Sequence, residues 1–144
     1  MTPDLAKENV ERLIVLTERL TDFLAADAKA FEERRPHEAT ARLEETSRLA
    51  NLYRHESTRV RGDPTLVASA PVETRQRLIR ATEGFEAVLA RHGRALYAAK
   101  EVTEGVVRAI AEEVAEARSA GAAYGPGART QPVAGAAVAL DRRA

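Results

Sequence analysis

The sequence predicts an all-α fold, an elongated antiparallel three-helix bundle or coiled coil followed by a disordered C-terminal tail. Apolar residues recur three and four positions apart through most of the first 120 residues, which is the spacing of helices with one buried face. Charged residues make up 31% of the chain and aromatic residues only 4%, so it suits the thin seam between long helices better than a thick core. From Gly121 onward, glycine, proline and alanine dominate the sequence.

The first helix is predicted over residues 3–35. Thr2 can cap it, Pro3 is tolerated at its first position, and Asp4 complements the positive end of the helix dipole. Asp27 interrupts its expected buried stripe, which consists of Val10, Leu13, Leu16, Leu20, Phe23, Leu24, Ala30 and Phe31. Pro36 ends or kinks this helix, because proline lacks an N–H and disfavours helix at the preceding residue. A tight hairpin and a kinked continuation both stay open, and the hairpin is favoured.

The second helix is predicted over residues 37–61 and the third over residues 71–120. Gly62, Asp63 and Pro64 form the stop signal between them, with Gly62 as the expected C-terminal cap. A loop with one short turn around Leu66 and Val67 should follow. The expected buried stripe of the third helix is Leu78, Thr82, Phe85, Leu89, His92, Leu96, Ala99, Val106, Ile110 and Ala117.

The tail, residues 121–144, is expected to be flexible. Its composition cannot bury enough apolar surface to fold alone. It nevertheless carries a weak apolar string, Val133, Val138 and Leu140, that could order on a partner. A helical bundle of residues 1–120 with such a tail is an architecture for holding a partner protein.

Composition argues against several classes of function. The formal net charge is zero, whereas nucleic-acid binders show a basic excess. The chain has no cysteine, which excludes disulfides, thiol catalysis and cysteine-ligated zinc. It shows neither a signal peptide nor a run of about 18 apolar residues, so we expect a cytoplasmic protein without membrane insertion.

No residue pattern points to catalysis, a metal or a cofactor. His37, His55 and His92 are far apart in sequence, and none stands in a metal-ligand spacing. Gly125 and Gly127 follow a helix and lack the lysine and hydroxyl residue of a phosphate-binding loop. The chain is therefore expected not to be an enzyme. A small enzyme-like bundle built on carboxylates or histidines is an alternative that no ligand spacing supports.

Three features together resemble a known family. The first is the text Arg12-Leu-Ile-Val-Leu-Thr-Glu-Arg-Leu20, followed by a second charged helix ending in Leu49-Ala-Asn-Leu-Tyr53-Arg-His-Glu56. The second is the single long third helix. The third is Tyr124-Gly-Pro-Gly-Ala-Arg-Thr-Gln131 and an alanine-rich stretch closing on Leu140-Asp-Arg-Arg-Ala144. The whole chain in outline thus resembles the FlgN-type flagellar export chaperones, and among them the alphaproteobacterial FlbY-like branch. It departs from the usual pattern at Pro36.

The resemblance implies a cytosolic helical chaperone of the flagellar type III export system. Such proteins bind the terminal helices of hook-associated proteins, prevent their premature assembly and deliver them to the export gate. By the same resemblance, Tyr124 matches the tail tyrosine that docks on an export gate component. The resemblance thus implies two partners, hook-associated cargo and the export gate.

A candidate cargo surface lies in the second half of the third helix, at Val102, Val106, Ile110 and Val114. Large side chains are few here, so a cargo helix could complete the packing. The competing interpretation is that these residues pack against the first helix. At the level of function, the alternative is a structural coiled-coil scaffold or basal-body-associated protein without chaperone activity. A weak homodimer is compatible with either.

Overall fold

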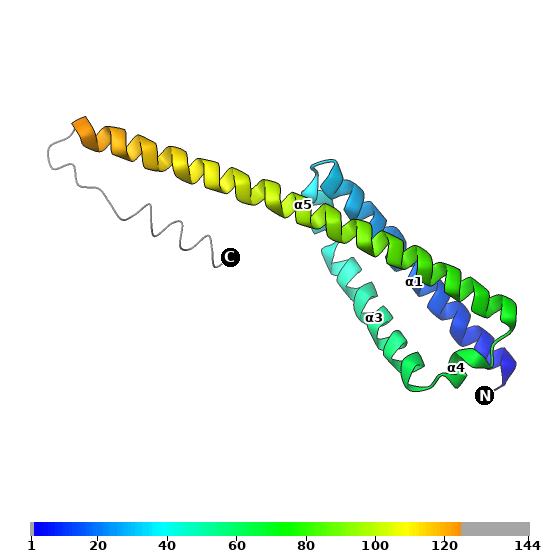
Figure 1. The fold of residues 1–144 in the computed structure, drawn as a ribbon. Helices are drawn as coiled ribbons and strands as arrows, with labels where there is room; N and C mark the ends of the chain where they lie inside the picture. The colour runs from blue at the N-terminus through cyan, green and yellow to red at the C-terminus, as the bar shows by residue number, and fades with distance from the viewer. Residues whose placement is uncertain (1, 125–144) are drawn as a thin grey trace. The chain divides into compact units, whose positions relative to one another are not determined.

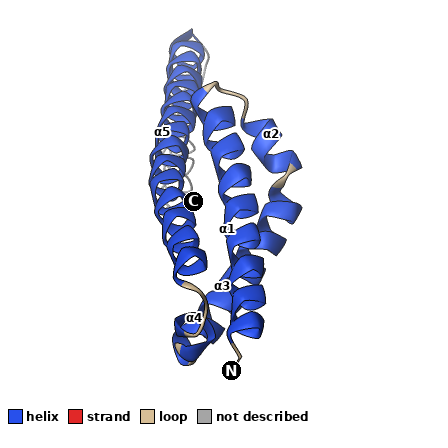
Figure 2. Cartoon of the chain, turned by 90° about the vertical axis from the view of Figure 1, so that its right-hand side faces the viewer, coloured by secondary structure: helices blue, strands red, loops and turns tan. Residues whose placement is uncertain are grey.

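The computed structural model describes residues 2–124, with side chains to Gly121, and the described chain is helical apart from short connections (Figure 1, Figure 2). The helices are α1 (Pro3–Glu32), α2 (Pro36–Ala41), α3 (Leu43–Gly62), α4 (Thr65–Ala68) and α5 (Val72–Tyr124). The predicted all-α class is confirmed. The chain divides into two compact units, residues 1–99 and residues 100–144, and α5 contributes to both.

Helix α1 begins as the sequence predicts and ends three residues early. The Thr2 hydroxyl accepts a hydrogen bond from the Leu5 N–H at 3.3 Å and caps the first turn. At the other end, the Arg34 N–H donates to the Phe31 carbonyl and the Arg35 N–H to the Ala30 carbonyl. These two bonds are the Schellman motif, which requires a left-handed residue, and Arg34 supplies it with φ of 61°. The helix therefore stops at Glu32, before Pro36 acts.

The chain reverses direction after α1, so a hairpin is formed and the helix does not continue. Asp27 pairs with Arg42 at 2.8 Å, and Arg19, further back along α1, lies 3.9 Å from Glu45, so α3 runs antiparallel to α1. The helix expected over residues 37–61 is two helices, α2 and α3, which part at Arg42. This break lies where the Arg42 guanidinium reaches the Asp27 carboxylate.

The stop signal after α3 works differently from the expectation. Gly62 is the last helical residue and does not adopt a positive φ; Asp63 is the cap. The Asp63 carboxylate accepts hydrogen bonds from the Thr65 N–H at 3.2 Å and the Thr65 hydroxyl at 2.6 Å, which starts the next turn. That turn is α4, at the place where a short turn was expected.

Within the first unit, the N-terminal part of α5 runs in the same direction as α1. Arg77 lies 3.5 Å from Glu11 near the start of both helices, and Phe31 contacts His92 edge-on at 5.8 Å further along. Two apolar clusters fill the space between helices. One comprises Ala6, Val10, Ile14 and Ala70, packed by Val67, Leu78 and Ala81; the other comprises Leu20, Leu24, Leu49 and Phe85, packed by Leu16, Phe23, Ala50, Tyr53 and Val88.

The buried stripe of α5 differs from the expected one at alternate positions. Leu89 and Leu96, expected inside, are 47% and 46% exposed. The inward residues are instead Thr74, Leu78, Ala81, Phe85, Val88, His92, Ala95 and Ala99, and Thr82, as predicted, is half-buried beside Ala81. The expected and the observed stripe share Leu78 and Phe85. From each shared residue the expected stripe continues four residues later, whereas the observed stripe continues three residues later. In α1, the residues that the expected stripe missed are Ala6, Ile14, Thr17 and Ala28.

Helix α5 also runs past its expected end at residue 120. Gly121 lies inside it, and Tyr124 is its last residue. A single glycine costs a helix only about 1 kcal/mol relative to alanine, and Ala122 and Ala123 follow directly. The first residue that excludes helix continuation is Pro126. The rest of the predicted tail lies outside the described residues.

Candidate functional site

The candidate cargo residues all lie on α5 within the second unit, and all are exposed to solvent. Val102 is 56% exposed, Val106 54%, Ile110 55% and Val114 46%. Steps of four residues exceed one helical turn, so the four side chains wind slowly around the helix surface. The competing interpretation, packing against the first helix, requires burial of these residues and stays a prediction.

Val107 belongs to the same exposed apolar surface and is absent from the predicted set. It is 45% exposed and shares with Ile110 and Val114 the alternating three- and four-residue spacing of a heptad. The signal available in the sequence was that Val106 and Val107 are adjacent. Two neighbouring residues cannot lie on the same narrow stripe of a helix, so the apolar surface must be wider than one stripe. The described part of the second unit thus exposes five large β-branched side chains within 13 residues.

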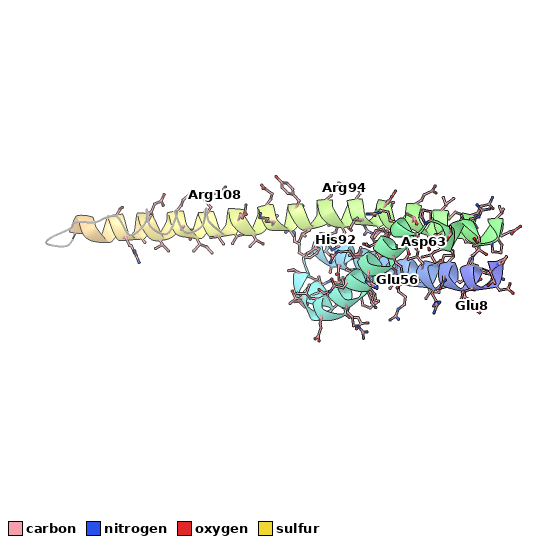
Figure 3. All side chains as sticks on the ribbon, turned by 90° about the horizontal axis from the view of Figure 1, so that it is seen from below. Glu8, Glu56, Asp63, His92, Arg94 and Arg108 are labelled. Atoms are coloured by element: carbon pink, nitrogen blue, oxygen red, sulfur yellow. The ribbon has the colours of Figure 1, made fainter. Side chains whose placement is uncertain are left out.

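Charged residues flank this surface. Residues 100–121 contain three basic and five acidic side chains, so the segment is acidic although the whole chain is neutral. Lys100 pairs with Glu104 four residues later, at 3.8 Å. Arg108 lies midway along the segment (Figure 3). The segment is therefore an amphipathic helix with acidic flanks.

The predicted site residues of the tail are not brought to this surface by the described structure. Tyr124, expected to follow a helix break, is instead the last residue of α5. Val133, Val138 and Leu140 lie outside the described residues. Their roles stay predictions.

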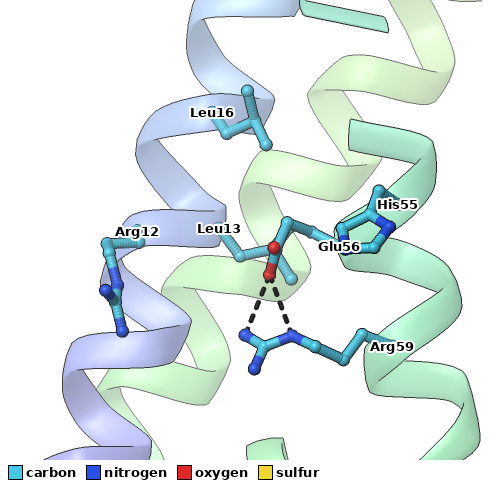
Figure 4. A pocket seen from close by; sticks show the side chains of 6 residues that line it. All are labelled: Arg12, Leu13, Leu16, His55, Glu56 and Arg59. Carbon is cyan, nitrogen blue, oxygen red and sulfur yellow. Dashed lines mark hydrogen bonds and ion pairs between the residues drawn. The ribbon is translucent and has the colours of Figure 1, made fainter. Parts of the chain in front are cut away.

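The first unit contains a groove between α1 and α3 that sequence reasoning did not find (Figure 4). Its volume is about 520 Å³, and its lining combines leucines with basic and acidic side chains: Arg12, Leu13, Leu16, His55, Glu56 and Arg59. The Arg59 guanidinium donates to the Glu56 carboxylate at 2.9 and 3.2 Å. Only the antiparallel pairing of α1 with α3 brings these residues together, so no local motif announces them.

A smaller hollow of about 310 Å³ lies where α3, α1 and α5 meet in the first unit. Thr17 and Thr82 face it, but both hydroxyls already donate to carbonyls of their own helices, at 2.7 Å to Leu13 and 2.9 Å to Leu78. Hydroxyls engaged in this way offer a ligand little polar recognition. This hollow is a packing gap between helices with few large side chains.

One ion pair in the first unit changes the acidity of its members. The Arg91 guanidinium donates to Glu32 through Nε at 3.0 Å and through Nη2 at 2.5 Å, joining α5 to α1. This hydrogen bonding, reinforced by the charges of Arg91 and Arg94, lowers the pKa of Glu32 below 4.5 against a smaller desolvation effect. It likewise raises the pKa of Arg91. The pair holds two helices together and lies on the surface, away from any cluster of reactive groups.

The described structure offers little else for chemistry. Residues 2–124 contain no group of three or more histidine, cysteine, aspartate or glutamate side chains placed to hold a metal ion. Over the same residues, no helix combines the length and the hydropathy needed to cross a membrane. The exposed apolar surface of α5 is thus the feature that most needs a functional explanation.

Comparison with known proteins identifies the family. The chain is 59% identical over 142 residues to the flagellar basal-body protein FlbY of Caulobacter vibrioides, an alignment that covers 96% of this chain and 95% of the relative. The chain belongs to the FlbY family. No protein-family model matches the chain, and no solved structure matches it. Of the predicted resemblance, the FlbY part is therefore confirmed, and membership of the FlgN type stays a prediction.

Proposed function

We propose that this FlbY-family chain takes part in flagellum assembly as an export chaperone of the FlgN type, acting in the cytoplasm. It binds a terminal amphipathic helix of a hook-associated protein, prevents that helix from assembling early, and brings the cargo to the export gate. The observation that carries the proposal is the row of exposed β-branched residues on α5 between Lys100 and Gly121. The family relationship to a flagellar protein supplies the cellular context.

The physical basis is that the exposed apolar faces of α5 and of the cargo helix cover each other. An amphipathic cargo helix presents anchors at positions i, i+3, i+4 and i+7, and it aggregates when this face is left in water. Val102, Val106, Ile110 and Val114 present an apolar strip that spans 13 residues. Packing the two strips together removes apolar surface from water on both molecules, worth about 25 cal/mol for each Å².

The side chains around the strip suggest which cargo helices fit and why they can be released. With five acidic and three basic residues, the segment favours a cargo helix whose flanks are basic. Valine side chains are short and make a shallow surface without aromatic anchors, which supply most hot spots of tight interfaces. Modest affinity suits a chaperone, because the cargo must leave at the gate.

Co-purification with hook-associated proteins tests the proposal. We expect the full chain to form a one-to-one complex with such a cargo. A shortened chain without residues 125–144 keeps every described helix and Tyr124. We expect it to bind cargo more weakly, since it lacks Val133, Val138 and Leu140, the predicted cargo residues of that end. Equal recovery of cargo and gate component by both chains would show that the tail has no part in binding.

A second candidate function is favoured by the name of the relative, which is called a basal-body protein. In that case the chain would be a structural scaffold component, and its exposed apolar face would pack permanently within the basal body. Fractionation distinguishes the two. A chaperone stays with free cargo and is absent from purified basal bodies, whereas a scaffold component co-purifies with them and binds no hook-associated protein.

A further inference from the structure

Within the exposed surface of the second unit, one stripe has the geometry of a coiled-coil seam. Val107, Ile110 and Val114 are separated by three and then four residues, and all are between 45% and 55% exposed. Thr103 and Ala117 extend the same 4-3-4-3 spacing by one step in each direction. This spacing keeps a stripe facing a partner helix over several turns when two helices supercoil. Val102 lies outside the stripe.

We propose that this stripe pairs with the same stripe of a second copy of the chain, as a parallel, in-register, two-stranded coiled coil. In heptad notation Val107 and Val114 occupy a positions, and Ile110 occupies the d position between them. Valine at the a positions suits two strands, whereas isoleucine at the d position between them favours three or four. The polar Lys100 at the preceding a position is therefore the residue that sets the number of strands. The assignment goes beyond the proposed function and does not depend on it.

The charges beside the stripe indicate that its partner is a second copy of the chain, and that the two helices run parallel. Glu113 occupies a g position and Arg118 the e position five residues later. In a parallel coiled coil a g residue faces the e residue of the next heptad on the other helix, so Glu113 of each copy faces Arg118 of the other. The two-fold symmetry of a homodimer makes this favourable pair twice. An antiparallel pairing would place g beside g and e beside e, and the complementarity would be lost.

The seam is short, and its first layer is polar. Lys100 occupies the preceding a position and reaches Glu104 of its own helix at 3.8 Å. A lysine at an a position lowers stability and fixes register. The dimer is therefore weak and reversible, and it covers Ile110 and Val114, which the proposed cargo helix also needs. A second copy and a cargo helix compete for this surface.

The absence of native cysteine allows a direct test in the full chain. Single variants Val107→Cys and Val114→Cys should each form a disulfide-linked dimer under mild oxidation, because identical a positions of a parallel dimer approach within disulfide reach. Ser119→Cys is the matched control, since it lies on the opposite side of the same helix and should cross-link little. Sedimentation equilibrium of the wild-type chain should show a concentration-dependent mass rising from 15.7 kDa towards twice that value.

Substitution separates the seam from the rest of the apolar surface. Val107→Glu should weaken self-association about tenfold or more, whereas Val102→Glu, which changes a somewhat more exposed valine outside the stripe, should leave it nearly unchanged. Helical circular dichroism checks that each variant is folded. A wild-type chain that stays monomeric at every concentration overturns the proposal. Cross-linking at only one of the two a positions, or equally at Ser119, overturns the parallel seam. A wild-type chain that dimerises but binds no hook-associated protein would instead count against the proposed function alone.

Discussion

Arg34 holds the least favourable backbone conformation of the described chain. Its φ of 61° is the only positive value at a residue other than glycine among residues 2–124. The left-handed conformation costs a residue with a Cβ about 1–2 kcal/mol, because Cβ crowds the following carbonyl oxygen. The two hydrogen bonds that close α1 at this point offset the cost.

Replacing Arg34 with glycine should therefore stabilise the protein. We expect Arg34→Gly to raise the free energy of unfolding by about 0.5–1 kcal/mol, since the relief of strain exceeds the added chain entropy of glycine. Urea denaturation measures the change. Arg34→Ala is the control, because it removes the guanidinium but keeps the Cβ, and it should give no gain. A gain of equal size from alanine would show that the side chain, and not the backbone, is responsible.

The Glu32–Arg91 pair predicts a specific acid dependence of stability. Because the folded pKa of Glu32 is lowered below 4.5, the pair stabilises the folded state above that pH, and the contribution is lost as the pH falls through the folded pKa. Wild-type protein should thus melt slightly higher than Glu32→Gln at pH 7, and the two should converge in acid. In an Arg91→Gln background the same glutamate substitution should show no such pH-dependent difference. A difference that persists unchanged at low pH would contradict this account.

At the residue scale, sequence reasoning succeeded where the signal is local. Thr2, Pro3 and Asp4 predict the start of α1 because a cap needs only neighbouring residues. The end of α1 was missed because Arg34 adopts a conformation that glycine or asparagine normally provides. Arginine is no signal for a left-handed residue, so the sequence could not place this turn.

At the scale of elements, one buried ion pair joins α1 to the junction of α2 and α3. The Asp27 side chain is 7% exposed, and the Arg42 guanidinium donates to it from Nε at 3.0 Å and from Nη2 at 2.8 Å. The carboxylate interrupts the apolar stripe of α1, which is why sequence analysis treated it as a gap. The structure shows instead a polar contact that fixes where α3 begins relative to α1.

Removing the arginine should be costly, because the carboxylate would stay buried without its partner. We expect Arg42→Ala to lower the free energy of unfolding by about 1–3 kcal/mol. Arg48→Ala serves as the control: that arginine pairs with Glu45 on the surface, and its loss should change stability by less than about 1 kcal/mol. Equal effects of the two substitutions in chemical denaturation would show that Asp27 does not depend on Arg42.

For α5, the sequence predicted the wrong residues to face inward between the positions that both stripes share. Helical periodicity alone allows either Val88 or Leu89, and either Ala95 or Leu96, to face inward between the shared positions Phe85 and His92. Hydrophobicity favours the leucines, yet the structure buries Ala95 and half-buries Val88. The buried residues of α1 also include small ones, Ala28 and Ala30. Small residues on both helices fit a packing in which there is no space for a leucine of α5. A single sequence does not show the distance between helices, so it could not decide the phase.

The whole molecule has a first unit that buries its own apolar faces and a helical second unit whose described large apolar residues are exposed. Helices α1, α3 and the first part of α5 bury their apolar faces against one another within residues 1–99. Residues 100–121 expose theirs. The four predicted cargo residues could be read from the sequence as an apolar strip, but their exposure could not, because a single sequence does not show which segments cover a helix face.

The central claim is that this exposed strip binds a cargo helix. Isothermal titration of the full chain with the terminal helical region of a hook-associated protein tests it most directly, using Val106→Glu in the strip and Val15→Glu on α1, which is 56% exposed, as the control. We predict one-to-one binding that Val106→Glu weakens about tenfold or more and Val15→Glu leaves unchanged. Binding that both variants retain at full strength, or no binding by the wild-type chain, would contradict the claim.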